Sequence, residues 1–230
     1  MLIRISSHIW ICFALSSSAI GQNLSDTLDR APMILQKNGF TIFYRTDYLC
    51  PEVVLYDLVP SDIVGPIKRT SVRFATDRST PSPRATHSDY TKSGYDRGHM
   101  CPAADRKSSA SRYMATFTMS NVVPMWPSVN REYWKAIEVA TRNLLRRYRH
   151  VVVLQGATFP DDPSRTLPRN RVRIPSHIWR AALALQPDTA LFCWVVANDT
   201  TARYQDTHRV PRDSLRRLLP IYLSTYNKPN

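Results

Sequence analysis

The chain has 230 residues, with 31 Lys and Arg against 18 Asp and Glu, and a formal net charge of +13. This length fits one domain with its own hydrophobic core. The excess of positive charge indicates a polyanionic partner or an anionic surface, and by itself it does not choose among nucleic acid, lipopolysaccharide and heparin-like chains.

Residues 1–21 have the form of a secretory signal peptide. A positive start at Arg4 is followed by an apolar stretch, Ile9–Leu15, and then by small residues ending at Gly21. The apolar stretch is too short to span a membrane. The alternative is an N-terminal core helix. We expect a secreted or periplasmic protein in which residues 22–230 form a single domain.

The next segments predict an arm, a hairpin and a loop, in that order. Residues 22–38 suggest a loosely held arm or a short helix. Apolar and aromatic residues alternate or cluster in 39–50 and 52–59, as in two paired strands. Residues 68–92 are rich in Arg, Ser, Thr and Pro and predict a long surface loop, of a kind that often carries substrate contacts.

Farther along, residues 129–148 keep a helical spacing of apolar side chains. The arginines at the end of this helix suggest complementation of its dipole or, alternatively, a phosphate-binding patch. A strand (151–156), a loop (160–173), a helix or strand (174–185), a buried strand (191–198) and a short closing helix (214–219) follow. No repeat or linker divides the chain, and the absence of regular βαβ alternation favours the α+β class.

Cysteine usage does not indicate a zinc site. Removal of the leader leaves Cys50, Cys101 and Cys193, an odd number that permits at most one intramolecular disulfide. None of them forms a C-x-x-C pair, and Cys101 lacks partners at zinc spacing.

The most informative segment is SGYDRGHMCPAAD, residues 93–105. Its D-R-G-H tetrad, residues 96–99, places Arg97 two residues before His99. Strand alternation would send both side chains to the same side, where a cation for a phosphate would adjoin an imidazole able to deprotonate water. The alternative is a charged turn with a surface histidine.

The chain here resembles the DNA/RNA non-specific endonucleases. The resemblance rests on three blocks in the family's order and spacing: residues 89–100 (DYTKSGYDRGHM), 120–125 (SNVVPM) and 129–138 (VNREYWKAIE). A weaker similarity runs from about residue 39 to residue 198. The last thirty or so residues do not resemble the family's usual ending. It implies a ββα-metal (His-Me finger) nuclease core on a central antiparallel sheet flanked by helices.

The resemblance assigns two residues to the reacting centre and one to the metal. Unperturbed imidazole titrates near pH 6.5, so neutral His99 is available as the general base. Arg97 would contact the scissile phosphate. Asn130 would hold one Mg²⁺, with Mn²⁺ as a substitute, because this hard ion takes oxygen ligands and keeps several waters. The alternative for Asn130 is an N-cap.

Three further residues would support these. Asn121 matches a second family asparagine that supports the site, and the alternative is an ordinary turn amide. Glu138 would act on the metal through water, and the alternative is an ion pair with Arg142 one helical turn on. Arg73 is the nearest candidate for the family's upstream phosphate-binding arginine, with Arg69 and Arg78 as competitors.

The resemblance therefore predicts a secreted, magnesium-dependent endonuclease that cuts DNA and RNA without sequence specificity and leaves 5′-phosphate ends. Its partners would be DNA and RNA, with no stable membrane insertion, and the sequence leaves open an inhibitor protein and a homodimer. The alternative is a secreted basic polyanion-binding protein with an inactive site. A sequence-specific DNA-binding protein fits the charge but lacks a recognisable motif.

Overall fold

A computed structural model describes residues 32–65, 67, 72–185, 190–202 and 208–210. The predicted signal peptide, the competitor Arg69 and the predicted closing helix 214–219 lie outside these ranges. The chain divides into two units, and the unit that is described here begins at Met33.

The described unit is built on a seven-stranded antiparallel sheet with the strand order β1-β2-β3-β6-β7-β8-β9. Its strands are β1 (Met33–Lys37), β2 (Phe40–Arg45), β3 (Cys50–Leu58), β6 (Val151–Thr158), β7 (His177–Ala184), β8 (Ala190–Ala197) and β9 (His208–Val210). The predicted hairpin is confirmed as β2 and β3, and the predicted strand at 151–156 as β6. Residues 174–185, left open between helix and strand, contain β7.

One prediction for this region is wrong. The segment expected to be an arm or a short helix contains the edge strand β1, which pairs with β2 from Met33↔Tyr44 to Lys37↔Phe40. Gly39 turns the chain between them with a φ of +93°, which glycine adopts without strain. Pairing with a neighbour therefore decides the conformation of a segment whose own pattern was weak.

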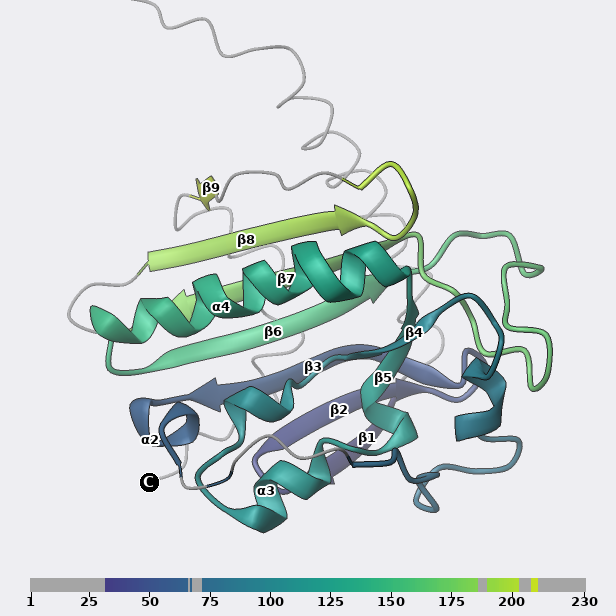
Figure 1. The fold of residues 1–230 in the computed structure, drawn as a ribbon, viewed down its shortest axis with the longest axis horizontal. Coiled ribbons are helices and arrows are strands. Elements are labelled where there is room, and N and C mark those ends of the chain that lie inside the picture. Colours follow the sequence, from purple (N-terminus) through teal and green to yellow (C-terminus); the bar gives the residue numbers. More distant parts are fainter. Residues whose placement is uncertain (1–31, 66, 68–71, 186–189, 203–207, 211–230) are drawn as a thin grey trace, which may run out of the picture. The chain divides into compact units, whose positions relative to one another are not determined.

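A second, two-stranded sheet pairs β4 (Asp96–His99) with β5 (Val122–Met125). A π-helical turn, Val129–Trp134, then leads into α4 (Lys135–Asn143). The remaining helices are α2 (Pro60–Ile63), α3 (Ala110–Ala115) and the 3-10 turns His87–Tyr90, Ala103–Asp105, Met119–Asn121 and Leu144–Arg146. The sequence β4, β5, α4 is the predicted ββα element, so the predicted α+β fold is confirmed (Figure 1).

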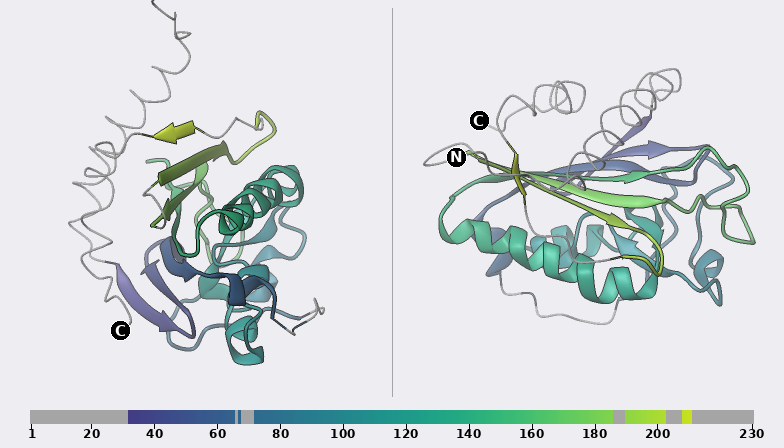
Figure 2. Two further views of the ribbon diagram at one scale, coloured as in Figure 1. Left: turned by 90° about the vertical axis from the view of Figure 1, so that its left-hand side faces the viewer. Right: turned by 90° about the horizontal axis from the view of Figure 1, so that it is seen from above.

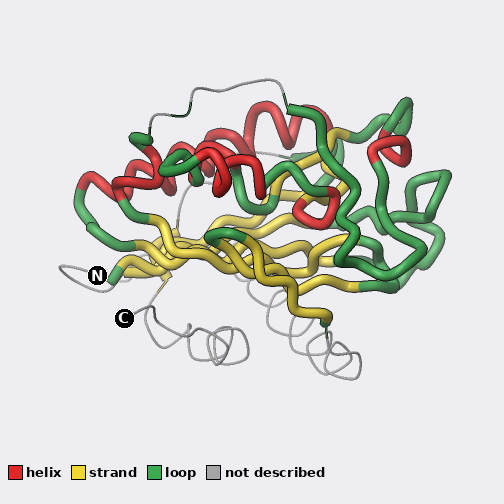
Figure 3. Tube along the Cα trace, turned by 90° about the horizontal axis from the view of Figure 1, so that it is seen from below, coloured by secondary structure: helices red, strands yellow, loops and turns green. Residues whose placement is uncertain are grey.

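The helices of the described part lie on one face of the large sheet (Figures 2 and 3). Strand alternation sends Val54, Val153, Ile178 and Trp194 to this face, where they join the main core with Trp134 and Ile137 of the helical segment. The other face carries a second apolar cluster: Phe43, Val53, Leu55, Val152, Leu154, Ala181 and Leu191. Because both faces are apolar, the central strands are nearly continuous hydrophobic runs.

Charged side chains are buried between the sheet and the helices. Asp105, which is fully buried, accepts hydrogen bonds from Tyr56 Oη (2.7 Å), from Arg142 of α4 (2.7 Å) and from Arg180 of β7 (3.2 Å). Such a network is costly to break, because removal of one partner leaves a buried charge uncompensated. It fixes α4 on the sheet, and with it the π-helical turn just before α4, which carries Asn130.

Candidate active site

Strand β4 brings the D-R-G-H tetrad against β5, with Asp96 opposite Met125 and His99 opposite Val122. Gly98 allows this close pairing. A Cβ atom at Gly98 would lie 2.7 Å from Cβ of Met125 and 2.4 Å from its Cε. The glycine of the tetrad is therefore required for packing.

The His99 ring lies between two phenylalanines. Its centroid is 4.8 Å from that of Phe74 and 5.2 Å from that of Phe117, which it meets edge to face. The carbonyl oxygen of His99 accepts a hydrogen bond (2.9 Å) from the amide of Gln155, a fully buried residue of β6. The ring and backbone of His99 are thus held by residues far away in sequence, none of which belongs to a recognisable motif.

Arg97 is held by the loop that precedes the tetrad. Its guanidinium donates to the carbonyl of His87 (2.8 Å) and lies 5.4 Å from the centroid of the Tyr90 ring. Burial lowers the pKa of Arg97; the charges of Tyr90 and Asp96 oppose this, and the like charge of Arg73 adds to it. The guanidinium stays a permanent cation for binding an anion.

Arg73 also acts on this region. Burial lowers the pKa of His87, and the positive charges of Arg97 and Arg73 lower it further. The side chain of Arg73 is exposed. Arg73 therefore adds positive potential beside Arg97. The competitor Arg78 is exposed as well. It is not among the causes that lower the pKa of His87 or of Arg97.

Asp89 and Tyr90, the first two residues of the block 89–100, anchor this loop. Asp89 is buried and caps its own turn by accepting from the Thr86 amide (2.6 Å). It also accepts from the backbone amide of Asn170 (3.1 Å), in the loop between β6 and β7. Tyr90 lies beneath Arg97. The aspartate and tyrosine thus support Arg97 from behind, a role for which the sequence alone gave no indication.

Asn130 lies in the π-helical turn, and its side chain faces the tetrad. Its Nδ2 donates to Oδ2 of Asp96 at 3.0 Å, while Arg131 binds both oxygens of the same carboxylate at 2.8 Å. Burial disfavours the charged form of Asp96, but the hydrogen bonds from Arg131 and Asn130 outweigh it, so the pKa of this carboxyl is below its ordinary value.

This contact decides which end of the Asn130 amide faces away from Asp96. An ionised carboxylate can only accept hydrogen bonds, so the NH₂ group must face it and Oδ1 must point elsewhere. No residue in the described ranges donates to that oxygen. A neutral oxygen of this kind suits Mg²⁺, which binds few protein ligands. The residues present therefore fit one metal ion held by Asn130. Among the residues described, no group of three or more His, Cys, Asp or Glu side chains could hold a metal.

Asn121 occupies a fully buried position behind β4. Its Oδ1 accepts from the Cys101 amide (2.9 Å), and its Nδ2 donates to the carbonyls of Cys101 (3.0 Å) and Thr116 (2.9 Å). All of these partners are backbone groups. The structure thus places Asn121 as a clamp on the chain that leaves β4, and not at the reacting atoms.

Glu138 lies on α4 with its carboxylate 3.9 Å from Nη1 of Arg142, the ion pair that the sequence offered as an alternative. Arg142 also binds Asp105, and Glu138 is one of the acidic groups that raise the pKa of buried Arg180 against the opposing effect of desolvation. Asn130 lies in the π-helical turn and Glu138 in α4, and Trp134, between them in the chain, is buried.

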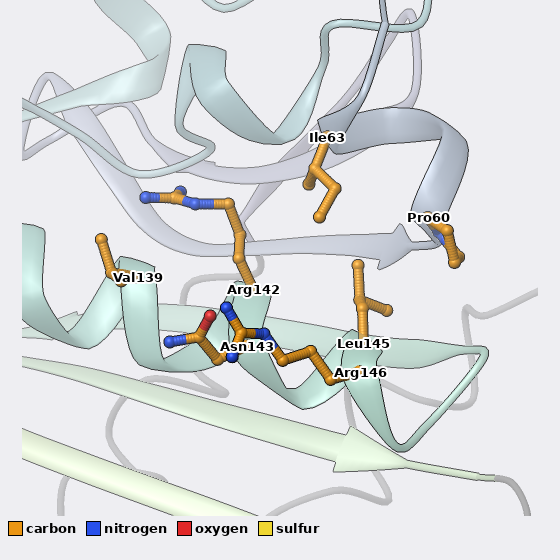
Figure 4. A pocket seen from close by; sticks show the side chains of 7 residues that line it. All are labelled: Pro60, Ile63, Val139, Arg142, Asn143, Leu145 and Arg146. Atoms are coloured by element: carbon orange, nitrogen blue, oxygen red, sulfur yellow. The ribbon is translucent and has the colours of Figure 1, made fainter.

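A pocket of about 350 Å³ lies beside the C-terminal half of α4 (Figure 4). It contains none of the predicted site residues. Its walls are formed by Pro60, Ile63, Val139, Arg142, Asn143, Leu145 and Arg146. Arg142 is already bound to Asp105, so only Arg146 contributes a cation without a partner among the described residues.

The three cysteines in the described ranges, Cys50, Cys101 and Cys193, are free thiols. Burial raises the pKa of Cys101 and of Cys193 to about 12, so neither is a reactive thiolate.

Fold and site together define the class of ββα-metal nucleases, in which a histidine strand is paired with a second strand and followed by a helix bearing an asparagine. The comparisons agree. The profile of the DNA/RNA non-specific endonuclease family matches residues 18–218, and the chain belongs to this family.

Curated relatives include mitochondrial nuclease EXOG of Mus musculus, which is 34% identical over 163 residues (64% of this chain and 44% of the relative). Mitochondrial endonuclease G of Homo sapiens is 33% identical over 140 residues (56% and 47%). A nuclease of a Nostoc species is 29% identical over 154 residues (66% and 54%). The chain thus spans about half the length of these relatives.

The fold is also similar to that of a chain in a crystal structure of the EndoG/EndoGI complex, which concerns the mechanism of EndoG inhibition. The TM-score is 0.71 at 23% identity, over 80% of this chain and 82% of that one. In the described part of the chain, no helix has the length and hydropathy needed to cross a bilayer.

The comparisons correct one prediction. A secreted or periplasmic location was expected from residues 1–21, but the EXOG and endonuclease G relatives from several vertebrates are mitochondrial nucleases. The expected location is therefore wrong. Composition and an apolar N-terminal stretch do not identify the compartment.

Proposed function

We propose that this chain hydrolyses phosphodiester bonds in DNA and RNA without sequence specificity, in a reaction that depends on a divalent metal ion. The observation that carries the proposal is the arrangement around β4. His99, Arg97 and the Asn130 amide are held by one short strand and the helix that follows it, each fixed by described contacts.

His99 acts as the general base. Its ring accepts a proton from water as the water oxygen forms a bond to phosphorus, and the bond from phosphorus to the 3′ oxygen breaks. The departing oxygen takes up a proton from solvent, which gives a 3′-hydroxyl and a 5′-phosphate. The packing of Phe74 and Phe117 restricts rotation of the ring, so little orientational freedom is lost when substrate binds.

Arg97 binds a non-bridging oxygen of the scissile phosphate and stabilises the charge that builds up there. Its hydrogen bond to His87 and its position over Tyr90 orient the guanidinium before substrate arrives. Arg73 adds a second, exposed cation that would bind phosphates of the same nucleic-acid strand. Neither contact reads a base, which is consistent with cleavage without sequence specificity.

Asn130 would hold the metal ion through Oδ1. Mg²⁺ bound there would withdraw charge from the phosphate and assist the leaving oxygen, and Mn²⁺ would substitute for it. Glu138 would orient metal-bound water, as a supporting residue and not as a ligand. Asn121 would support the site by clamping the end of β4.

A cleavage assay tests this function. Purified chain is incubated with supercoiled plasmid and with total RNA, with Mg²⁺ or with excess chelator. We expect nicking, linearisation and RNA degradation only with Mg²⁺, and a steep loss of activity with added salt because phosphate contacts supply most of the binding. Binding of both substrates without cleavage would favour the alternative, an inactive polyanion-binding protein. The similarity to a chain of the EndoG/EndoGI complex also supports a search for an inhibitor protein by adding candidates to this assay.

A further inference from the structure

Two aromatic residues lie near Asp96 and Asn130 along the chain and have no part in the proposed chemistry. Tyr95 immediately precedes β4, and Trp126 immediately follows β5. Their ring centroids are 5.6 Å apart with an interplanar angle of 78°, and both side chains are partly exposed. Because β4 and β5 are paired, the rings lie together at the end of the ribbon where Asp96 faces Met125.

The backbone beneath these rings is fixed on both sides. Trp126 N donates to Oδ1 of the fully buried Asn198 at 2.7 Å, and Trp126 O accepts from Asn130 N at 2.9 Å. Tyr95 N donates to Ser93 Oγ at 3.2 Å. Trp126 therefore lies just before the helical residues that lead to Asn130, and the backbone hydrogen bond from Asn130 joins the two residues. Arg97 lies opposite Pro124, one residue pair from this end of the ribbon, so a phosphate bound by Arg97 would bring a neighbouring nucleotide toward the two rings.

The polar atoms of both rings have no partner in the described part of the chain. No residue there hydrogen bonds with the Tyr95 hydroxyl or with the Trp126 indole N–H. An edge-to-face pair covers one face of one ring only, so the other ring faces are not used by this contact. Aromatic faces with polar edges of this kind suit a nucleobase, which offers a flat surface and hydrogen-bonding groups around its rim.

We propose that Tyr95 and Trp126 form a stacking surface for an unpaired nucleobase next to the phosphate bound by Arg97. The proposal rests on the proposed function, since it assumes that the ligand is a nucleic acid. Stacking tolerates any base, so this surface strengthens binding without adding sequence specificity. It favours single strands over duplex, because a paired base is already stacked on its neighbours.

Binding to labelled oligodeoxynucleotides, followed by fluorescence anisotropy, tests the proposal. All proteins carry His99→Ala so that the strand stays intact. The probes are a single strand, the same strand with abasic residues, and the corresponding duplex. With the rings present, we expect abasic substitution to weaken binding by about 10-fold. Trp126→Ala should weaken binding of the normal strand by about the same factor and remove the sensitivity to abasic residues, with a much smaller effect on the duplex.

Two variants serve as controls. Trp126→Phe keeps an aromatic face and should retain most of the affinity for the normal strand. Val195→Ala removes a side chain that is 50% exposed on β8 and should change nothing. Thermal unfolding shows whether Trp126→Ala is folded, and Trp126→Leu provides a second variant that fills the site without an aromatic ring.

The proposal is overturned if Trp126→Ala and Trp126→Leu remain sensitive to abasic residues, or if duplex and single strand lose affinity equally. This outcome is distinct from failure of the proposed function. If the wild-type chain cleaved no nucleic acid, the function would be wrong, whereas the binding comparison, which needs no cleavage, would still decide whether a base stacks here.

Discussion

Oδ2 of Asp96 accepts a hydrogen bond from Nδ2 of Asn130 at 3.0 Å, and this contact determines which end of the asparagine amide is presented for a metal ion. Arg131, a largely exposed residue, donates to both oxygens of the same carboxylate. The aspartate of the tetrad therefore has a positioning role that its place in the sequence motif did not reveal.

Asp96→Asn should weaken metal binding without removing the metal ligand. The new amide can either donate or accept, so it no longer forces the Asn130 oxygen outward. Supporting contacts of this kind typically contribute about 10- to 100-fold in affinity. Isothermal titration with Mg²⁺ measures the effect. Arg131→Gln is the matched control and should cost less, because the Asp96–Asn130 bond remains. Unchanged Mg²⁺ affinity in Asp96→Asn would refute the positioning role.

Asn130→Ala and Glu138→Ala should differ in kind. Loss of the amide oxygen should lower Mg²⁺ affinity directly, whereas loss of the Glu138 carboxylate should mainly lower kcat, by about 10- to 100-fold, with partial recovery at high Mg²⁺. If the 3.9 Å pair with Arg142 is the only role of Glu138, its removal should cost about 0.2–0.5 kcal/mol of stability and leave kcat unchanged. Magnesium titrations of activity in both variants separate these outcomes.

Gly98→Ala should destabilise the fold by about 1–3 kcal/mol, because the added Cβ overlaps Met125 of β5. Chemical denaturation measures the loss. Met125→Ala removes a buried side chain and is itself destabilising, but the double variant should lose less stability than the sum of the two single losses, since the clashes with Cε and Sδ disappear while that with Cβ remains. If the two substitutions were simply additive, the close approach of β4 and β5 at this position would not be the cause.

Asp77 should make the stability of the fold depend on pH in the acidic range. Burial opposes its ionisation, but Lys37, Ser120 and Ser79 bind the carboxylate and lower its pKa to about 2. A carboxyl whose pKa is depressed on folding stabilises the fold above its unfolded pKa, near 4, and this contribution is lost as the pH falls toward 2.

Asp77→Asn should therefore cost on the order of 2 kcal/mol at neutral pH and almost nothing near pH 2. Urea denaturation of both proteins across this range gives the difference. A cost that stays constant with pH would show that lost packing, and not lost charge, explains the effect.

The sequence predicted most clearly what is local. The period of residues 129–148 predicted the helix, and the three motif blocks gave His99, Arg97 and Asn130 as candidate site residues. It did not predict what depends on partners far along the chain. Strand β1 forms because β2 is beside it, and the His99 backbone depends on Gln155, 56 residues away. The contact between Asp96 and Asn130 needs β4, β5 and the π-helical turn together, and no spacing in the sequence gives it.

The central claim is that His99 is the base of a metal-dependent nuclease, and single-turnover cleavage of a defined single strand by His99→Ala tests it most directly. We expect a rate about 10²- to 10⁴-fold below wild type with Mg²⁺ present, unchanged affinity for the strand, and partial recovery with added imidazole. A His99→Ala protein that cleaved at the wild-type rate would contradict the account.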